Sequence, residues 1–273
     1  MPILHAIVLG IVQGLSEFLP ISSSGHLAVV PWLFGWTELA DDPGLNRTFD
    51  VALHLGTLVG AAAYFRADLR RLAAAALRHR PGTEADARLA RLLVVASVPA
   101  SLVGAVLEAV VPDRDGGEWL VGVLLVVFGL VLLAADRRPE RRAMGEMGPR
   151  DALLMGAAQA LALQPGVSRA GATISMGRWL GLSRDSATRF SFLMGLPVTA
   201  GAGLLKGAQL VAGGGLPAGF AGAFAGGALT SAVTGFAAVW LTLRVVRTRS
   251  FTPFVVYRVA AGLLVIVVGV ARA

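Results

Sequence analysis

Two short polar segments, 13–26 and 159–172, place ionisable and hydroxyl side chains inside apolar surroundings. The first carries Glu17 and His26 on either side of a serine run, and the second carries Arg169. A charged residue at the centre of a membrane helix costs about 2.5–3.5 kcal/mol on insertion scales, so such residues usually have a partner or a task. The two segments therefore predict a functional site.

The first segment reads as a helix, a break and a second helix start. Gln13 and Glu17 are four residues apart, which places them on one helical face. Pro20 interrupts that helix, and the serine run 22–24 followed by Gly25 supplies hydroxyls and flexible backbone where a new helix can begin. Irregular backbone at membrane depth is tolerated only in buried protein or beside a wet cavity, so we expect a polar cavity here. One serine is a candidate nucleophile or phosphate donor, and the others are candidate helix caps.

The second segment has the same plan with a Pro165–Gly166 break. A helix that begins after the break exposes free N–H groups, which suit an anion. Arg169 adds a permanent charge and a fork of donors matched to phosphate oxygens. The segment therefore predicts a phosphate cradle.

Each charged residue also has a structural alternative. Glu17 at the membrane interface would simply be solvated, His26 would be a satisfied packing residue, and Arg169 would snorkel to the cytoplasmic surface. We favour function because the two segments repeat each other. A shift of 146 positions superposes Gly10 on Gly156, Gln13 on Gln159, Leu15 on Leu161, Ser22 on Ser168 and Gly25 on Gly171.

A second, weaker match accompanies the first at a shift of 141. Chance recurrence of common residues in apolar helices explains it equally well. It pairs Phe49, Leu55 and Gly60 with Phe190, Leu196 and Gly201.

The composition predicts the elements that must position these residues. The chain has 273 residues, 55% hydrophobic and 15% charged, with a mean hydropathy of +0.70, which is too apolar for a soluble domain. No cleavable signal sequence is evident, and the absence of cysteine excludes disulfides and thiolate chemistry. Predicted spans are 89–111, 119–135, 190–211, 218–243 and 254–270. A shorter sixth at 51–65 either starts slightly earlier or sits in a thinned region of the bilayer.

The net charge of +7 does not indicate nucleic acid, because the arginines are neither on one amphipathic helix nor interleaved with aromatic residues. Their clusters mark cytoplasmic connections, whereas the acidic segments 38–42 and 113–118 should lie outside. The clusters are Arg66, Arg70, Arg71, Arg78, Arg80, Arg88 and Arg91; Arg137, Arg138, Arg141, Arg142 and Arg150; Arg178, Arg184 and Arg189; and Arg244, Arg247 and Arg249.

This charge map predicts an all-α polytopic membrane protein with an inverted-topology repeat. With the N-terminus outside, neither polar segment crosses the membrane, so each half is a re-entrant helical hairpin plus three transmembrane helices. Residues 1–273 then form a single integral membrane domain made of repeats 1–135 and 150–273. Sites in such proteins form at the midplane between the repeats.

Taken together, these residues resemble the undecaprenyl-diphosphate phosphatase family of bacterial inner-membrane enzymes, also called bacitracin-resistance proteins. The resemblance runs essentially end to end. Segment 13–26 looks like the glutamate-rich motif of that family, and segment 165–171 looks like its Pro-Gly-x-Ser-Arg-Ser-Gly motif. The resemblance implies hydrolysis of undecaprenyl diphosphate to the monophosphate carrier lipid for peptidoglycan synthesis, with Mg²⁺ or Ca²⁺, at a site opening to the periplasmic face.

The resemblance also assigns roles. The catalytic candidates are Glu17, Ser23, His26 and Arg169; the phosphate-binding candidates are Ser22, Ser24, Gly25, Ser168, Arg169 and Gly171; Gln13 and Thr173 are supporting; and Glu17 with Gln13 is the candidate metal site. Gln13 stands where many members have glutamate, so we expect hydrogen bonding there rather than full charge on a metal. Ala170 replaces the second serine of the later motif, which removes one candidate phosphate contact.

Two reaction schemes stay open. Ser23 attacks phosphorus with His26 as base, or His26 activates water or attacks by itself. The main alternative to an enzyme is a transporter, and the same chain can also flip the monophosphate lipid. A purely structural subunit would leave the buried charges unexplained.

The partners expected are the polyisoprenyl diphosphate lipid and the bilayer, with no nucleic acid. Small-residue runs at 201–203 and 222–227 suit close helix packing, and a homodimer stays open. We expect Asp50 and His54, at i and i+4, to be solvated at the outer interface, with support of the cavity as the alternative. Tyr257 and Arg258 are expected to anchor the last helix at its cytoplasmic end.

Overall fold

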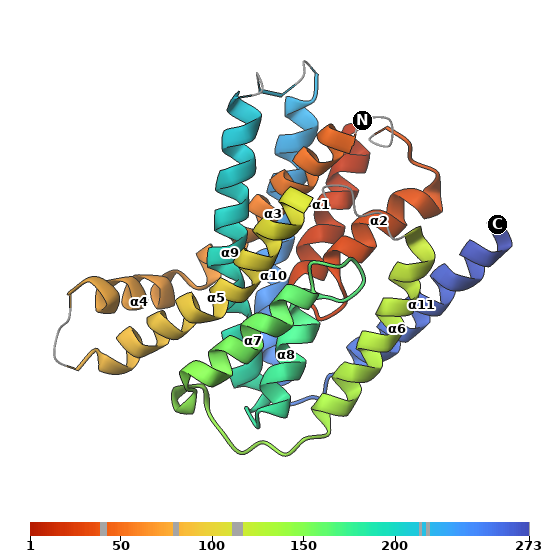
Figure 1. The fold of residues 1–273 in the computed structure, drawn as a ribbon. Helices are drawn as coiled ribbons and strands as arrows, with labels where there is room; N and C mark the ends of the chain where they lie inside the picture. The colour runs from red at the N-terminus through yellow and green to blue at the C-terminus, as the bar shows by residue number, and fades with distance from the viewer. Residues whose placement is uncertain (39–42, 79–81, 111–116, 213–214, 217–218, 273) are drawn as a thin grey trace.

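The computed structural model describes residues 1–38, 43–78, 82–110, 117–212, 215–216 and 219–272 (Figure 1). Most of the described residues are helical, and none of them forms a β-strand beyond one isolated bridge between Arg142 and Leu182. The all-α prediction is confirmed. The helices are α1 (Ile3–Phe18), α2 (Ser23–Phe34), α3 (Pro43–Tyr64), α4 (Arg66–Arg78), α5 (Glu84–Val110), α6 (Gly117–Asp136), the 3₁₀ turn η1 (Met144–Glu146), α7 (Pro149–Leu161), α8 (Arg169–Trp179), α9 (Arg184–Ala212), α10 (Ala221–Val246) and α11 (Thr252–Arg272).

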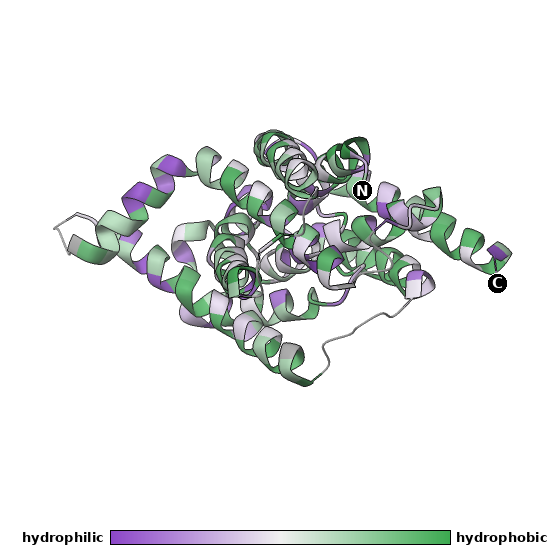
Figure 2. Ribbon diagram, turned by 90° about the horizontal axis from the view of Figure 1, so that it is seen from above, coloured by the Kyte–Doolittle hydropathy of each residue, from purple (hydrophilic) through white to green (hydrophobic). Residues whose placement is uncertain are grey.

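Five of these helices are long and apolar enough to cross a membrane: α5, α6, α9, α10 and α11. They match the five predicted long spans, although the predicted ends at Val111 and Ala218 lie outside the described residues. A sixth span forms if α3 and α4 are one broken span, bent by 81° between them. The last of them, α11, is hydrophobic along most of its length (Figure 2). Because several such helices are present, the chain is a multi-pass membrane protein.

Two helical hairpins approach the centre of the molecule from opposite ends (Figure 1). The α1–α2 hairpin descends from the end that carries the N-terminus, and the α7–α8 hairpin rises from the other end. Their breaks meet, because the Gly166 N–H of the second donates to Ser22 Oγ of the first at 3.1 Å. The predicted helix–break–helix pattern of both polar segments is therefore confirmed.

The packing of the two hairpins is matched between the halves. Helix α1 packs on α10 as α7 packs on α5, and α6 packs on α11. Gly10 of α1 permits a close approach, since a Cβ there would lie 2.4 Å from the Gly227 carbonyl oxygen of α10. Gly156, which matches Gly10 at the shift of 146, allows the same close approach. A Cβ there would lie 2.4 Å from the Ala96 carbonyl oxygen of α5. These matches support a duplication, and the orientation of each half in a membrane stays a prediction.

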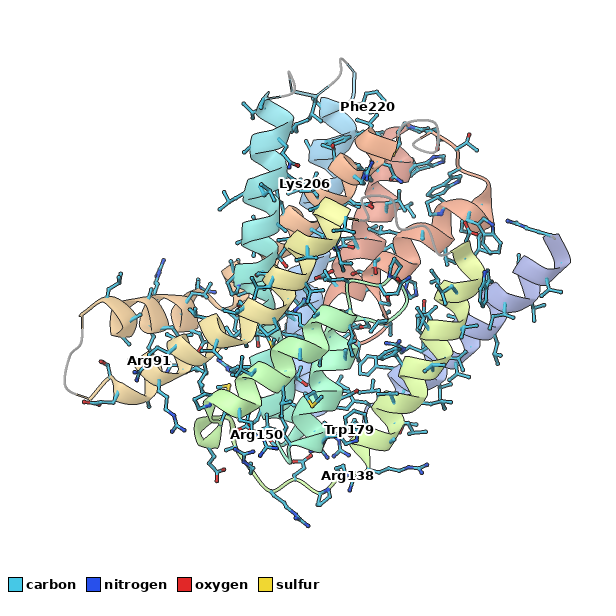
Figure 3. All side chains as sticks on the ribbon, viewed as in Figure 1. Arg91, Arg138, Arg150, Trp179, Lys206 and Phe220 are labelled. Carbon is cyan, nitrogen blue, oxygen red and sulfur yellow. The ribbon has the colours of Figure 1, made fainter. Side chains whose placement is uncertain are left out.

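Basic side chains gather at the end opposite the N-terminus. Figure 3 labels Arg91, Arg138 and Arg150 toward that end and Lys206 toward the other. There, Arg142 donates to both carboxylate oxygens of Asp151, at 3.1 and 2.7 Å, and so fixes the start of α7. Burial by itself would raise the pKa of Asp151, but the hydrogen bonds from Arg142 and from the Gly148 N–H outweigh it and hold that pKa below its ordinary value. The gathering of arginines at the end opposite the N-terminus agrees with the prediction that this end is cytoplasmic.

Candidate active site

The two hairpin breaks end in equivalent helix caps. Ser22 precedes α2 and Ser168 precedes α8, and their φ angles of 78° and 73° are the only positive values among the described non-glycine residues. Their hydroxyls accept the N–H groups of Gly25 and Gly171, at 3.4 and 3.1 Å. Such backbone geometry is costly, and the caps stabilise it. Each break consequently starts its second helix with a serine-capped N-terminus, and the Gly166 N–H brings the two breaks together at Ser22.

Glu17, at the end of α1, is the centre of a buried polar cluster. Its Oε2 accepts from Gln13 Nε2 at 3.0 Å and from Ser23 Oγ at 2.7 Å, and its Oε1 accepts from Arg169 Nη2 at 3.0 Å. Only 7% of Glu17 is exposed, so interfacial solvation is excluded. The Arg169 pair joins residues from the two halves and neutralises a carboxylate that would be costly to bury alone.

Arg169 is held on several sides. Its Nη1 donates to the Ser191 carbonyl at 3.3 Å, and its guanidinium lies 5.9 Å from the centre of the Phe18 ring. Gly195 gives it room, because a Cβ there would lie 1.8 Å from Nη1. Thr173 Oγ1 bonds the Arg169 carbonyl at 2.7 Å and Ser191 Oγ at 2.6 Å. The snorkelling alternative for Arg169 is therefore wrong.

His54 joins the cluster, although we expected it to be solvated at the outer interface. Its Nδ1 lies 2.7 Å from the Asp50 carbonyl oxygen, which can only accept, so Nδ1 carries a proton. Its Nε2 lies 3.6 Å from Glu17 Oε2. The cavity-supporting alternative holds for His54, and the i, i+4 pairing with Asp50 was the only signal for it in the sequence.

His26 is placed apart from this cluster. Its Nδ1 lies 2.6 Å from the Ser22 carbonyl oxygen, and its Nε2 lies 2.7 Å from the hydroxyl of Tyr257 on α11, with the two rings stacked. Within the described residues it forms no hydrogen bond with Ser23 or Glu17. A catalytic role for His26 stays a prediction.

Arg258 of α11 bridges both hairpin breaks, and no sequence motif had marked it for that role. It is fully buried, so the prediction that it anchors α11 at the cytoplasmic end is wrong. Nη1 donates to Pro20 O at 3.0 Å and Nη2 to Gly166 O at 2.9 Å. Pro20 and Gly166 are equivalent at the shift of 146, so one guanidinium ties matching carbonyls of the two halves.

The predicted phosphate-binding residues divide into two groups. Ser22 and Ser168 are buried and use their hydroxyls as caps next to Gly25 and Gly171. Ser24 is half-buried, and its hydroxyl forms no hydrogen bond in the part of the chain that the structure describes. The N-termini of α2 and α8 and the Ser24 hydroxyl are thus the available donors for an anion.

One orphaned atom bears on the predicted cation. Gln13 Oε1 is buried without a hydrogen-bond partner, next to the Glu17 carboxylate that Gln13 Nε2 contacts. Amide and carboxylate oxygens are ligands that Mg²⁺ and Ca²⁺ prefer, and Mg²⁺ sites often complete their coordination with substrate phosphate. No group of three or more His, Cys, Asp or Glu suited to a metal occurs among the described residues. The residues fit a cation that depends on the substrate for further ligands.

Comparison with known proteins places the whole chain among related sequences. The family model described as bacitracin resistance protein BacA matches residues 6–264. Undecaprenyl-diphosphatase of Geobacter sulfurreducens is 48% identical over 267 residues, covering 96% of both chains. Undecaprenyl-diphosphatase of Pelotomaculum thermopropionicum is 46% identical, covering 100% of this chain and 98% of its own, and that of Thermomicrobium roseum is 47% identical with both chains fully covered.

Proposed function

The chain belongs to the family of bacitracin resistance protein BacA, and from this membership we infer that it is an undecaprenyl-diphosphatase. It hydrolyses undecaprenyl diphosphate to undecaprenyl phosphate and inorganic phosphate, which recycles the carrier lipid for peptidoglycan synthesis and confers bacitracin resistance. A transporter without enzymatic activity is excluded by this membership.

The buried pair between Glu17 and Arg169 is the observation that carries the assignment of the site. It puts a guanidinium beside two helix N-termini at the junction of the hairpins. Oriented N–H groups and an arginine fork are matched to phosphate oxygens, and fixed donors stabilise the charge that develops during phosphoryl transfer. We therefore place the terminal phosphate of the substrate against Arg169, the N-termini of α2 and α8, and Ser24.

Ser23 is the nucleophile that the geometry favours. Its hydroxyl already donates to Glu17 Oε2 at 2.7 Å, so the proton has an acceptor when Oγ attacks the terminal phosphorus. The anhydride P–O bond breaks, undecaprenyl phosphate leaves, and water then hydrolyses the phosphoserine to release inorganic phosphate. His26 is not needed as a base for this step, because Glu17 is the acceptor in place.

The proposal includes a divalent cation, Mg²⁺ or Ca²⁺. Glu17 and Gln13 Oε1 would hold it together with phosphate oxygens. Bound there, it would supply charge neutralisation on the phosphate. Arg169 Nη2 also lies 3.0 Å from Glu17 Oε1, so the guanidinium shares this carboxylate.

We place the protein in the bacterial inner membrane with the site opening to the outer face. A small cavity of about 120 Å³ supports this orientation, because it is lined by Met1, His5 and Asp50, and Asp50 is one helical turn from His54. His54 Nε2 in turn lies 3.6 Å from Glu17 Oε2, and the lining residue Met1 places the cavity at the end that carries the N-terminus (Figure 1). Lipid flipping and a homodimer remain predictions, tested by lipid transport in proteoliposomes and by the mass of the purified protein in detergent.

The deciding experiment measures phosphate release from undecaprenyl diphosphate by the purified protein in detergent with Mg²⁺ or Ca²⁺. We expect Ser23→Ala to lower kcat about 1000-fold or more, since loss of a nucleophile removes the covalent route. Ser97→Ala is the matched control, because the hydroxyl of Ser97 on α5 donates to the Leu93 carbonyl of its own helix and to no other group among the described residues. Substantial residual turnover in Ser23→Ala would overturn the covalent route and favour direct attack by water.

A further inference from the structure

A cavity of about 420 Å³ lies between α5, α9 and the break of the second hairpin. We propose that it binds the isoprenoid tail of the lipid substrate, over the units that follow the diphosphate. The proposal rests on the function proposed above, and it assigns the part of the protein that binds the hydrocarbon chain of the substrate. The cavity is lined mainly by small and apolar residues, among them Ala100, Gly104, Leu163, Val198, Gly201 and Leu205.

The cavity begins about one helical turn along α9 from the position of Arg169. On α9, Gly195, Val198 and Ala202 follow one another at spacings of three and four, which places them on one face of the helix. Arg169 lies on Gly195, and Val198 and Ala202 line the cavity. A diphosphate held by Arg169 therefore has its attached chain at the start of this cavity.

The chemistry of the walls suits a hydrocarbon chain that continues into the bilayer. Ser101 and Lys206 are the two polar side chains in the lining. On the same stretch of α9, the lining residue Leu205 and its neighbour Leu204 are 55% and 76% exposed. Figure 3 shows Lys206 on the part of α9 toward the end that carries the N-terminus, so the cavity runs from the hairpin break toward that end. Apolar walls hold an isoprenoid without unpaired polar groups.

A second apolar cavity is a weaker candidate for the same tail. It has a volume of about 130 Å³ and is lined by His26, Tyr257 and Ala261 on the α11 side. Its lining also includes Gly25 at the start of α2, but no residue of α9, on which the guanidinium of Arg169 rests. The larger cavity, whose lining residue Val198 lies one helical turn from Gly195, is therefore the one that we assign.

Two glycines make the proposal testable without disturbing the backbone. A Cβ added at Gly201, which lines the cavity, would meet nothing within 4 Å. Gly207 is also open within 4 Å and lies on the same helix, but outside the cavity lining. Gly201→Leu therefore fills the cavity, and Gly207→Leu makes the same chemical change elsewhere on α9.

The experiment compares a long and a short substrate on the full-length protein in detergent. The KM for undecaprenyl diphosphate is measured by phosphate release, and isopentenyl diphosphate is measured by its inhibition constant against that reaction. We expect Gly201→Leu to raise the KM for the long substrate about 10-fold or more and to leave the inhibition constant of the short one unchanged. Gly207→Leu should change neither value.

Other outcomes overturn the assignment. If Gly201→Leu changes the KM of the long substrate and the inhibition constant of the short one equally, or changes neither, this cavity does not bind the isoprenoid tail. If Ala261→Phe instead raises only the KM for the long substrate, the tail lies on the α11 side. If the folded wild-type protein releases no phosphate, the proposed function itself fails, which is a different result from a wild type that is active but insensitive to Gly201→Leu.

Discussion

The positively charged guanidinium of Arg169 has little freedom to move in the site. Arg169 is bound through Glu17 and the Ser191 carbonyl, and Gly195 leaves the space that its guanidinium fills. An arginine with a fixed position provides the same fork to every phosphate that enters, whereas a mobile one would lose entropy on each binding event. The absence of a side chain at Gly195 is thus part of the site.

The first residue-scale prediction concerns Gly195→Ala. The new methyl group would occupy the position of Arg169 Nη1, so the guanidinium must leave its partners. A misplacement of about 1 Å can cost about 100-fold, and we expect kcat/KM for undecaprenyl diphosphate to fall 10- to 100-fold. Phosphate release measures it, with Gly207→Ala as the control at an open position of the same helix. Wild-type activity in Gly195→Ala would show that the observed pose of Arg169 is not required.

At the scale of the elements, Arg258 fixes the two hairpins relative to each other. Its guanidinium serves carbonyls at both breaks and also Leu125 O of α6 at 3.1 Å. Backbone carbonyls freed by helix breaks inside a membrane need such a partner, because no water is available to them. The clamp from α11 therefore sets the spacing of Ser22 and Ser168, and through them the N-termini of α2 and α8.

We predict that Arg258→Lys lowers stability and also lowers activity at temperatures where the protein is still folded. One ammonium group cannot reach carbonyls on both hairpins and α6, and each buried acceptor left unpaired costs about 1–3 kcal/mol. We expect a lower midpoint of thermal unfolding in detergent and, below that midpoint, a loss of kcat of about 10-fold or more.

Arg272→Lys is the matched control, because Arg272 also lies on α11 and donates to carbonyls, those of Trp32 and Leu33, from an exposed position. Unchanged stability and kcat in Arg258→Lys would show that the hairpins are placed without this clamp.

At the scale of the whole molecule, the two ends differ in charge and in access. The labelled arginines Arg91, Arg138 and Arg150 lie toward one end (Figure 3), and the small cavity lined by Met1 and Asp50 lies at the other. Positive residues favour the cytoplasmic side of a membrane. The molecule is therefore expected to admit substrate phosphate from the outer face.

Cysteine labelling in intact cells tests this orientation, because the natural chain contains no cysteine. Asn46 lines the small cavity that also contains Met1 and Asp50, and Gly145 lies in the exposed turn η1, so Asn46→Cys and Gly145→Cys report on the two ends. We expect a membrane-impermeant maleimide to label the first variant in intact cells and the second only after the cells are opened. The reverse pattern would place the site on the cytoplasmic face.

Much of the architecture was predictable because it depends on local patterns. Hydrophobic runs long enough to span a bilayer, Pro20 and Pro165–Gly166 as helix breaks, and serines before new helices each act within a few residues. The structure places all five long spans and both breaks where those patterns predict them. The shift of 146 also anticipated the matched caps at Ser22 and Ser168.

The sequence by itself determined the class of protein, the helix breaks and the charged residues that burial makes costly. Only the tertiary structure decided that His54 faces Glu17, that His26 pairs with Tyr257, and that Arg258 reaches both breaks. The reason is that these contacts join helices far apart in the chain, such as His26 and Tyr257 at a separation of 231 residues. Helix periodicity fixes which face a side chain lies on, and the packing of neighbouring helices fixes what that face meets.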